Sequence, residues 1–304
     1  MVSNSYFSKT ILFLSIFSCA FSACASTIET KTSPTAEPTK DTVAPTIEPL
    51  IEETRSMGEN DECLADEGHF EFFEMTSDVM NYPMEGRVYL PPCYGSDPDH
   101  RYPVLYFLHG QSFRDDQWDR LGADETLDAL VGSGEIEPFI IIMPKETNYM
   151  NNQWDSKYGV SLAEELVPYI DKEYRTMQTR EGRAIGGLSR GAAWAMRVGM
   201  IYWETFSAIG CHSFAPFRGD YNEAPFWFKE IPRESQHRIY IDMGFLDVNL
   251  DAAYHFETRL LKYGVPHEWH VFHGTHNEAY WSTHVADYLF WYAQGWKAIA
   301  DREP

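Results

Sequence analysis

The sequence has few positive charges for its length. Its 304 residues include 24 Lys and Arg against 46 Asp and Glu, so the formal net charge is −22 at pH 7. Proteins that bind nucleic acid need clustered cations to neutralise phosphates, and a strongly acidic chain repels polyanions. The composition therefore argues against nucleic acid as a partner and against a polyanionic substrate, and otherwise it bears only on solubility.

Cysteine is scarce as well, with 5 in the chain. Cys63 precedes the first predicted strand and Cys93 follows the second, so a hairpin would bring the two together. A disulfide between them would close a loop of about 30 residues and could stabilise an exported domain by about 3–4 kcal/mol on the chain-entropy model. Cys211 ends an apolar strand and is expected to be a small buried hydrophobe.

The apolar run at residues 11–23 is too short to span a membrane and has the length of a signal-peptide core. It ends in small residues before Cys24, an arrangement typical of a bacterial lipobox, in which Cys24 would carry the lipid. Phe21 stands where leucine is usual, and the alternative is a secretory signal cleaved near Ala23 or Ala25. Both interpretations predict a signal peptide at 1–23 and an exported protein, either a lipoprotein anchored at the cell surface or a secreted one.

Residues 24–60 are dominated by Thr, Pro, Ser and Glu and show no apolar periodicity. Such a segment buries too little apolar surface to offset the entropy of ordering, so a disordered tether is predicted there. From about residue 61 the composition becomes aromatic-rich, and residues 61–304 are long enough for one large domain. No internal repeat is visible.

This domain alternates apolar strands with helical patterns. Alternation of this kind predicts an α/β fold with a mainly parallel sheet covered by helices on both faces. Reactive groups in such sheets gather at the carboxyl ends of the strands. Outside residues 183–197, strands are predicted at 69–75, 86–90, 103–108, 139–143, 206–211, 238–242 and 268–272, and helices at 123–131, 161–174, 250–263 and 278–300.

The stretch Gly187-Leu-Ser-Arg-Gly191 follows a short apolar strand and precedes an Ala-rich helical pattern. Gly-x-Ser-x-Gly in a strand–turn–helix context predicts a nucleophile elbow, in which the glycines let two backbones approach closely. Ser189 would then stand at a helix N-terminus, where unpaired N–H groups favour a developing negative charge. The pattern is short enough to arise by chance, so the interpretation depends on partners elsewhere in the chain.

A serine nucleophile needs a base, and the base needs an acid that orients it. In this type of fold the chain order is serine, acid, histidine. Asp247 follows a strand in a Gly-x-x-Asp turn, and His276 follows the last strand in a Gly-x-His loop. The alternatives are Asp242, which lies within the strand, and His273, which lacks the glycine that would let its loop bend over the sheet.

Two backbone N–H groups are predicted to form an oxyanion hole. One belongs to Arg190, the residue after the nucleophile, and the other to Gln111, in the loop after the strand at 103–108. Gly110 would permit the tight turn in that loop, and His109 is expected to shape it.

No cofactor and no metal are expected. Histidines recur every three residues at 267, 270, 273 and 276, which makes a metal site tempting. Three-residue spacing on a strand alternates faces, so these side chains cannot converge on one ion.

Five segments together resemble the Putative esterase family of the alpha/beta hydrolase superfamily, which includes esterase D, the enterochelin esterases, the feruloyl esterases and the bacterial mycolyltransferases. The segments are 86–94, 102–110, 165–171, 184–191 and 274–281, and the resemblance covers about residues 69–295. It implies an α/β-hydrolase fold and a serine carboxylic ester hydrolase that acts through a Ser-His-Asp triad and an acyl-enzyme. The spacing of the three residues is close to that of the feruloyl esterase branch.

The implied substrate is therefore a carbohydrate-linked or aromatic acyl ester. An acyltransferase, in which a sugar hydroxyl replaces water, is one alternative, and a non-catalytic surface lipoprotein that binds carbohydrate is another. Aromatic residues would suit either ligand, although most of them are expected to be core residues. The pocket candidates are Trp118, Trp154, Phe217, Trp227 and Trp281, of which Trp281 is expected to pack behind His276.

The sequence departs from the family pattern at several positions. Arg190 and Ala192 stand where Met and Gly are usual, Cys93 replaces a glycine, and Cys211-His212-Ser213 replaces a Ser-Gly pair. Arg190 places a long cation beside Ser189, which is expected to bias the pocket toward anionic or polar acyl groups.

Overall fold

The structure, a computed structural model, describes residues 67–300. The signal peptide, the lipidation of Cys24, the tether and Cys63 lie outside the described residues and stay predictions. Within the described part of the chain, no helix is long and apolar enough to cross a membrane.

Eight strands form a single sheet in the order β1-β2-β4-β3-β5-β6-β7-β8. The pairs β1–β2 and β2–β4 are antiparallel and all later pairs are parallel, so the predicted mainly parallel α/β sheet is confirmed. The strands are β1 (His69–Met75), β2 (Met84–Leu90), β3 (Val104–Leu108), β4 (Ile140–Pro144), β5 (Arg183–Leu188), β6 (Ala208–His212), β7 (Arg238–Gly244) and β8 (Glu268–Phe272).

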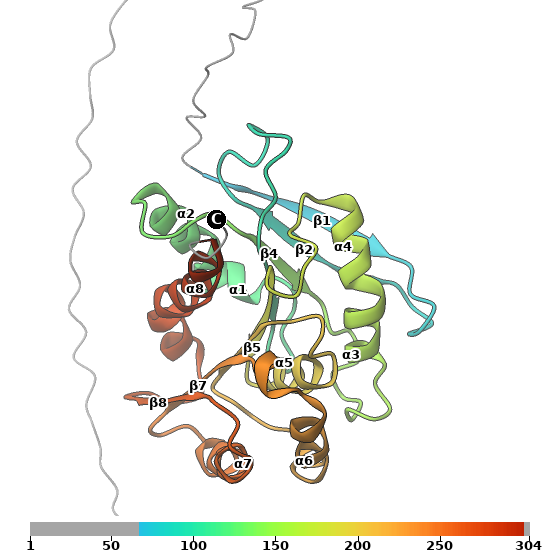
Figure 1. The fold of residues 1–304 in the computed structure, drawn as a ribbon, viewed down its shortest axis with the longest axis vertical. Coiled ribbons are helices and arrows are strands. Elements are labelled where there is room, and N and C mark those ends of the chain that lie inside the picture. The colour runs from blue at the N-terminus through green and yellow to red at the C-terminus, as the bar shows by residue number, and fades with distance from the viewer. Residues whose placement is uncertain (1–66, 301–304) are drawn as a thin grey trace, which may run out of the picture. The chain divides into compact units, whose positions relative to one another are not determined.

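Helices cover both faces of the sheet, as Figure 1 shows for α2 and α8 on one side and α3, α4 and α5 on the other. Strands β3 to β6 are buried along their whole length because both of their faces are covered. The helices are α1 (Gln117–Arg120), α2 (Ala123–Gly132), α3 (Tyr158–Ser161), a π-helical turn (Leu162–Leu166), α4 (Val167–Glu173), α5 (Arg190–Ile201), α6 (Asp220–Glu230), a 3₁₀ turn (Arg233–Ser235), α7 (Leu250–Tyr263) and α8 (Glu278–Ala300).

Alternate residues of each central strand enter different apolar layers, as the period of two in a strand requires. On β3, Leu105 and Phe107 pack with α1, α2 and α8, whereas Val104 and Tyr106 pack with the layer formed by α3 to α7. The two layers fix the strands rigidly, so the loops at the strand ends start from defined positions.

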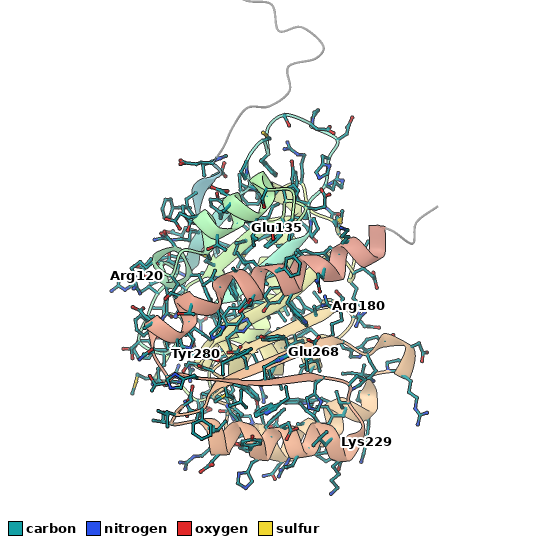
Figure 2. All side chains as sticks on the ribbon, turned by 90° about the vertical axis from the view of Figure 1, so that its left-hand side faces the viewer. Arg120, Glu135, Arg180, Lys229, Glu268 and Tyr280 are labelled. Atoms are coloured by element: carbon teal, nitrogen blue, oxygen red, sulfur yellow. The ribbon has the colours of Figure 1, made fainter. Side chains whose placement is uncertain are left out.

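The carboxyl ends of the parallel strands lie at one end of the sheet. Figure 2 shows Arg120 and Tyr280 toward that end and Arg180, which precedes β5, toward the opposite end. Residues that directly follow β3, β5, β7 and β8 are therefore brought to the same end of the sheet.

A buried histidine at the amino ends of the parallel strands makes the stability of the fold depend on pH. His237 precedes β7 and is 4% exposed; burial and the nearby Arg180 cation lower its pKa to about 3. Between pH 6.5 and 3 the unfolded chain therefore takes up a proton that the folded protein does not, so stability falls as the pH falls through this window.

Replacing His237 with leucine is expected to remove this dependence. Between pH 7 and pH 5 the free energy of unfolding of the wild type should fall by about 2 kcal/mol more than that of the variant, since the slope of one such group approaches 1.4 kcal/mol per pH unit. Urea unfolding at pH 7, 6 and 5 measures the difference. Equal pH dependence in the two proteins would show that His237 does not carry it.

Candidate active site

Ser189 lies in a tight turn between β5 and α5 with a backbone conformation that is unfavourable for a non-glycine residue, φ 55° and ψ −115°. Such conformations cost about 1–3 kcal/mol and persist only where the surroundings impose them. The Ser189 N–H donates to the His212 carbonyl at 2.9 Å, which ties the turn to β6. A Cβ on Gly191 would lie 2.3 Å from the Leu108 carbonyl oxygen, so only glycine fits there. The predicted elbow geometry is present.

Three side chains from the ends of three strands form a continuous hydrogen-bonded chain. The Ser189 hydroxyl donates to His276 Nε2 at 2.8 Å, and His276 Nδ1–H donates to Asp247 Oδ2, also at 2.8 Å. The structure thus brings together the three residues that the sequence singled out, after β5, β7 and β8. The carboxylate beside Nδ1 selects the tautomer in which Nε2 is free to accept a proton.

Asp247 is held as a carboxylate. It is 5% exposed, and its Oδ1 also accepts the Asn249 N–H at 2.8 Å. Burial by itself would raise its pKa, but the hydrogen bonds from His276, from the Asn249 N–H and from Ser213 hold the pKa of Asp247 below its usual value of 3.8. An ionised carboxylate here can orient the imidazole and stabilise the imidazolium that forms during proton transfer.

The alternative acid, Asp242, is hydrogen-bonded to His212 and not to His276. Its Oδ1 accepts a hydrogen bond from His212 Nδ1 at 2.7 Å, and its Oδ2 accepts the hydroxyls of Tyr280 at 2.7 Å and Tyr288 at 3.0 Å. His212 and Asp242 are both fully buried, and burial lowers the pKa of His212. The departure at Cys211-His212-Ser213 therefore builds a buried polar cluster beneath the site. The other alternative, His273, lies on the exposed surface.

The loop after β3 contributes Gly110 and Gln111 to the lining of the cavity that also contains Ser189. The Gly110 N–H donates a hydrogen bond to Gln117 Oε1 at 2.8 Å. The N–H groups of Gln111 and Arg190 make no hydrogen bond with any acceptor in residues 67–300, and both residues line a cavity together with Ser189. These are the two N–H groups that the sequence predicted for an oxyanion hole.

The cavity over Ser189 has a volume of about 850 Å³. Two of the predicted pocket aromatics, Phe217 and Trp281, line it. The Trp281 ring meets the His276 ring edge-on at 5.2 Å, in line with the predicted packing, and its Nε1–H donates to Ser213 Oγ at 2.7 Å. The full lining is Gly110, Gln111, Ser112, Phe113, Ser189, Arg190, Ala215, Phe217, Asn249, His276, Asn277, Glu278, Ala279 and Trp281.

The other three pocket candidates lie elsewhere, which corrects the prediction. Trp118 is 1% exposed, stacks on Phe107 at 3.5 Å and belongs to the core. Trp154 is 53% exposed and its indole N–H donates to Glu223 at 2.6 Å, outside the cavity. Trp227 lies 5.4 Å from the Arg197 guanidinium and does not line the cavity either. Position along the chain could not show which way these side chains point.

The Arg190 side chain is paired and is not a free cation in the cavity. Its Nε and Nη2 donate to the two carboxylate oxygens of Glu146 at 2.7 and 2.6 Å, and Nη2 also donates to the Asn151 carbonyl at 2.8 Å. The guanidinium lies 5.1 Å from the centre of the Phe217 ring. The charge of Arg190 is thus neutralised by a buried carboxylate and is not free to attract an anionic acyl group.

The two cysteines in the described residues differ in their bonding. Cys211 is a free thiol, buried as predicted, and burial raises its pKa. Cys93 is disulfide-bonded. Because Cys63 lies outside the described residues, its pairing with Cys93 stays a prediction. Residues 67–300 contain no group of three or more His, Cys, Asp or Glu that could hold a metal ion.

Comparison with known families finds one match over most of the chain. The family described as "Putative esterase" matches residues 77–292. An alignment of 114 positions with an endo-1,4-beta-xylanase/feruloyl esterase of Xylanibacter ruminicola shows 37% identity and covers 34% of this chain and 16% of that protein. An alignment of 244 positions with an esterase of Mycobacterium tuberculosis shows 28% identity and covers 62% of this chain and 51% of that protein. The chain thus spans about half or less of these curated relatives.

Solved structures share the fold. A ferulic acid esterase superposes with a TM-score of 0.67 at 26% identity, over 76% of this chain and 99% of that one. The feruloyl esterase module of Clostridium thermocellum complexed with sinapinate gives 0.64 at 17% identity, over 74% and 88%. The S-formylglutathione hydrolase of Staphylococcus aureus gives 0.62 at 16% identity, over 74% and 99%. The last two show likeness of fold alone.

Proposed function

This chain belongs to the Putative esterase family, a family of serine esterases, and from that premise we propose that it is a carboxylic ester hydrolase in which Ser189, His276 and Asp247 act as a catalytic triad. The observation that carries the proposal is the unbroken hydrogen-bonded chain from the Ser189 hydroxyl through His276 to the buried Asp247 carboxylate. It provides a nucleophile, its base and the group that orients the base.

The geometry supports a two-step reaction. In the first step His276 Nε2 takes the proton of Ser189 while Oγ attacks the ester carbonyl carbon, and the electron pair of the C=O bond moves to the oxygen. The N–H groups of Gln111 and Arg190 would bind that oxyanion, and each such donor is typically worth about 2.7–4 kcal/mol of barrier.

Collapse of the intermediate then re-forms the carbonyl and breaks the bond to the alcohol, which leaves with the proton from His276. The resulting acyl-enzyme is attacked by water, and His276 takes a proton from that water. The second tetrahedral intermediate expels Ser189 Oγ, to which His276 returns the proton, and the acid is released.

We propose an uncharged, aromatic acyl ester carried on a carbohydrate as the substrate. Phe113, Phe217 and Trp281 supply apolar wall to the cavity, and aromatic rings bind well against such surfaces. Arg190 is the one cationic residue of the described lining, and Glu146 neutralises it, while the acidic Glu278 is paired with Arg120 at 3.0 Å. A glutathione thioester, which carries two carboxylates, therefore finds no unpaired cation in the cavity wall.

Two test substrates distinguish an uncharged aromatic acyl ester from a glutathione thioester. The value of kcat/KM for methyl ferulate is expected to exceed that for S-formylglutathione at least about tenfold, which corresponds to about 1.4 kcal/mol of differential transition-state binding. Ser189→Ala is the blank for both substrates. Preference for the glutathione thioester would overturn the substrate assignment and leave the triad standing, whereas no hydrolysis of any ester would overturn the function.

A further inference from the structure

Glu146 is a buried carboxylate that the reaction described above does not use. It lies two residues beyond the end of β4 and is 4% exposed. Burying a charge is costly unless it is paired and hydrogen-bonded. Its partners therefore indicate what the residue does.

The carboxylate of Glu146 holds the nucleophile elbow. Both of its oxygens accept hydrogen bonds from the Arg190 guanidinium, at 2.7 and 2.6 Å, in a two-pronged contact. Such a contact fixes orientation as well as distance, because the planar guanidinium matches the carboxylate. Arg190 follows Ser189 directly, and its own N–H is one of the two proposed oxyanion donors.

The backbone of Glu146 holds the other half of the oxyanion hole. Its N–H donates to His109 Nε2 at 2.8 Å, and the Nδ1–H on the other side of the same ring donates to the Gly110 carbonyl at 2.7 Å. Burial lowers the pKa of His109, so the neutral ring with one donor and one acceptor is favoured, and both nitrogens are used. Gln111, the second proposed donor, follows Gly110.

We propose that Glu146 is a positioning residue that sets the separation of the Gln111 and Arg190 N–H groups, one contact acting through His109 and the other through the Arg190 side chain. The inference rests on the proposed function, because it assigns a role within the oxyanion hole. The two donors come from different segments, after β3 and after β5, and the contacts of Glu146 tie one to the other.

The separation matters because an oxyanion hole works by preorganisation. A displacement of about 1 Å at a reacting group can cost about 100-fold in rate, and complete loss of one donor costs about 100–1,000-fold in kcat. Loss of the link through Arg190 should leave both N–H groups present but less well placed. We therefore expect an effect on kcat of about tenfold or more.

An ion pair that only stabilises the fold would behave differently, and a paired substitution separates the two roles. Removing one partner leaves an uncompensated buried charge, which destabilises strongly, whereas replacing both partners with apolar residues of similar volume is often neutral. The double variant Glu146→Leu/Arg190→Met also leaves the net charge of the site unchanged. A change in its kcat would therefore report position and not charge.

The chain offers a matched control on the same helix. Arg197 of α5 donates to the buried Asp220 at 2.5 Å, and the side chains are 13% and 3% exposed, against 10% and 4% for Arg190 and Glu146. The control is Asp220→Leu/Arg197→Met. It removes an ion pair of similar burial that contacts neither oxyanion segment, together with the second contact of Arg197, to Glu223 at 2.9 Å.

The experiment compares both double variants with the wild type on methyl ferulate, together with the ¹H–¹⁵N amide resonance of Gln111. For Glu146→Leu/Arg190→Met we expect kcat to fall about tenfold or more with KM within about twofold, and the Gln111 resonance to move. The control should keep a wild-type kcat and Gln111 resonance.

A folded Glu146→Leu/Arg190→Met protein with wild-type kcat and an unmoved Gln111 resonance would overturn the inference. If the wild type hydrolysed no ester at all, the proposed function would fall. The Gln111 resonance does not depend on turnover, so it would still decide whether Glu146 positions this loop.

Discussion

Replacing Ser189 with alanine is expected to lower kcat for ester hydrolysis about 10⁶-fold while the protein stays folded. The reason is that the hydroxyl oxygen is the atom that attacks, and residual catalysis would come only from the oxyanion hole and substrate binding. The substitution removes one oxygen that bonds to His276 and leaves the backbone of the turn unchanged. Steady-state hydrolysis of methyl ferulate measures the loss, and urea unfolding checks the fold.

A second serine at the opposite end of the same sheet is the control. Ser207 precedes β6, and its hydroxyl donates to the carbonyls of Glu181 and Arg183. Ser207→Ala makes the same chemical change away from the cavity. Because Ser207 contacts no residue of the proposed triad, kcat should stay within about twofold of the wild type. If Ser189→Ala retained more than about 1% of wild-type kcat, another group would have to be the nucleophile.

Two aspartates of neighbouring segments are expected to give opposite results. Asp247→Asn should lower kcat about 10⁴-fold with a small change in stability, because an amide in that place favours the wrong tautomer of His276. Asp242→Asn should instead lower the free energy of unfolding by about 2–5 kcal/mol, because the buried carboxylate accepts hydrogen bonds from His212, Tyr280 and Tyr288.

The pair serves as its own control, since each variant makes the same substitution. Both kcat and urea unfolding are measured for each protein. A large kcat loss in Asp242→Asn together with near-normal activity in Asp247→Asn would reverse the assignment of the acid, whatever the distances in the structure.

The residues of the proposed triad could be predicted from the sequence because each follows a strand. The carboxyl ends of parallel strands meet at one end of the sheet, so residues 189, 247 and 276 had to come close once the strands were assigned. The choice of Asp247 over Asp242 followed from the same logic, since a residue within a strand stays in the sheet. The structure places Asp242 with His212 instead.

The partner of Arg190 could not be predicted. Glu146 is 44 positions away in the chain, and nothing in the local pattern around either residue shows that they meet. The sequence therefore suggested a free cation that biases the pocket toward anionic or polar acyl groups, whereas in the described lining the Arg190 guanidinium is paired with Glu146. The meaning of a charged residue beside a nucleophile depends on tertiary contacts that periodicity does not encode.

Two other differences have local causes. Helix α6 was not predicted, and it contains Pro225, which lacks an N–H and is unfavourable inside a helix. The helix predicted at 161–174 is divided by the π-helical turn Leu162–Leu166. Trp118 and Trp281 are both buried in the apolar layer that contains α1 and α8, and only tertiary packing determines that Trp281 also lines the cavity.

We propose that Ser189 is a nucleophile activated by His276, and covalent labelling of the serine hydroxyl can show whether it is. The folded wild-type protein is incubated with a fluorophosphonate, which reacts with activated serines, and is analysed by intact mass and peptide mapping. We expect one adduct per chain, located on Ser189 and absent from Ser189→Ala, with labelling strongly slowed in His276→Ala. A folded wild-type protein that gains no adduct, or gains it on another residue, would show that Ser189 is not the activated nucleophile.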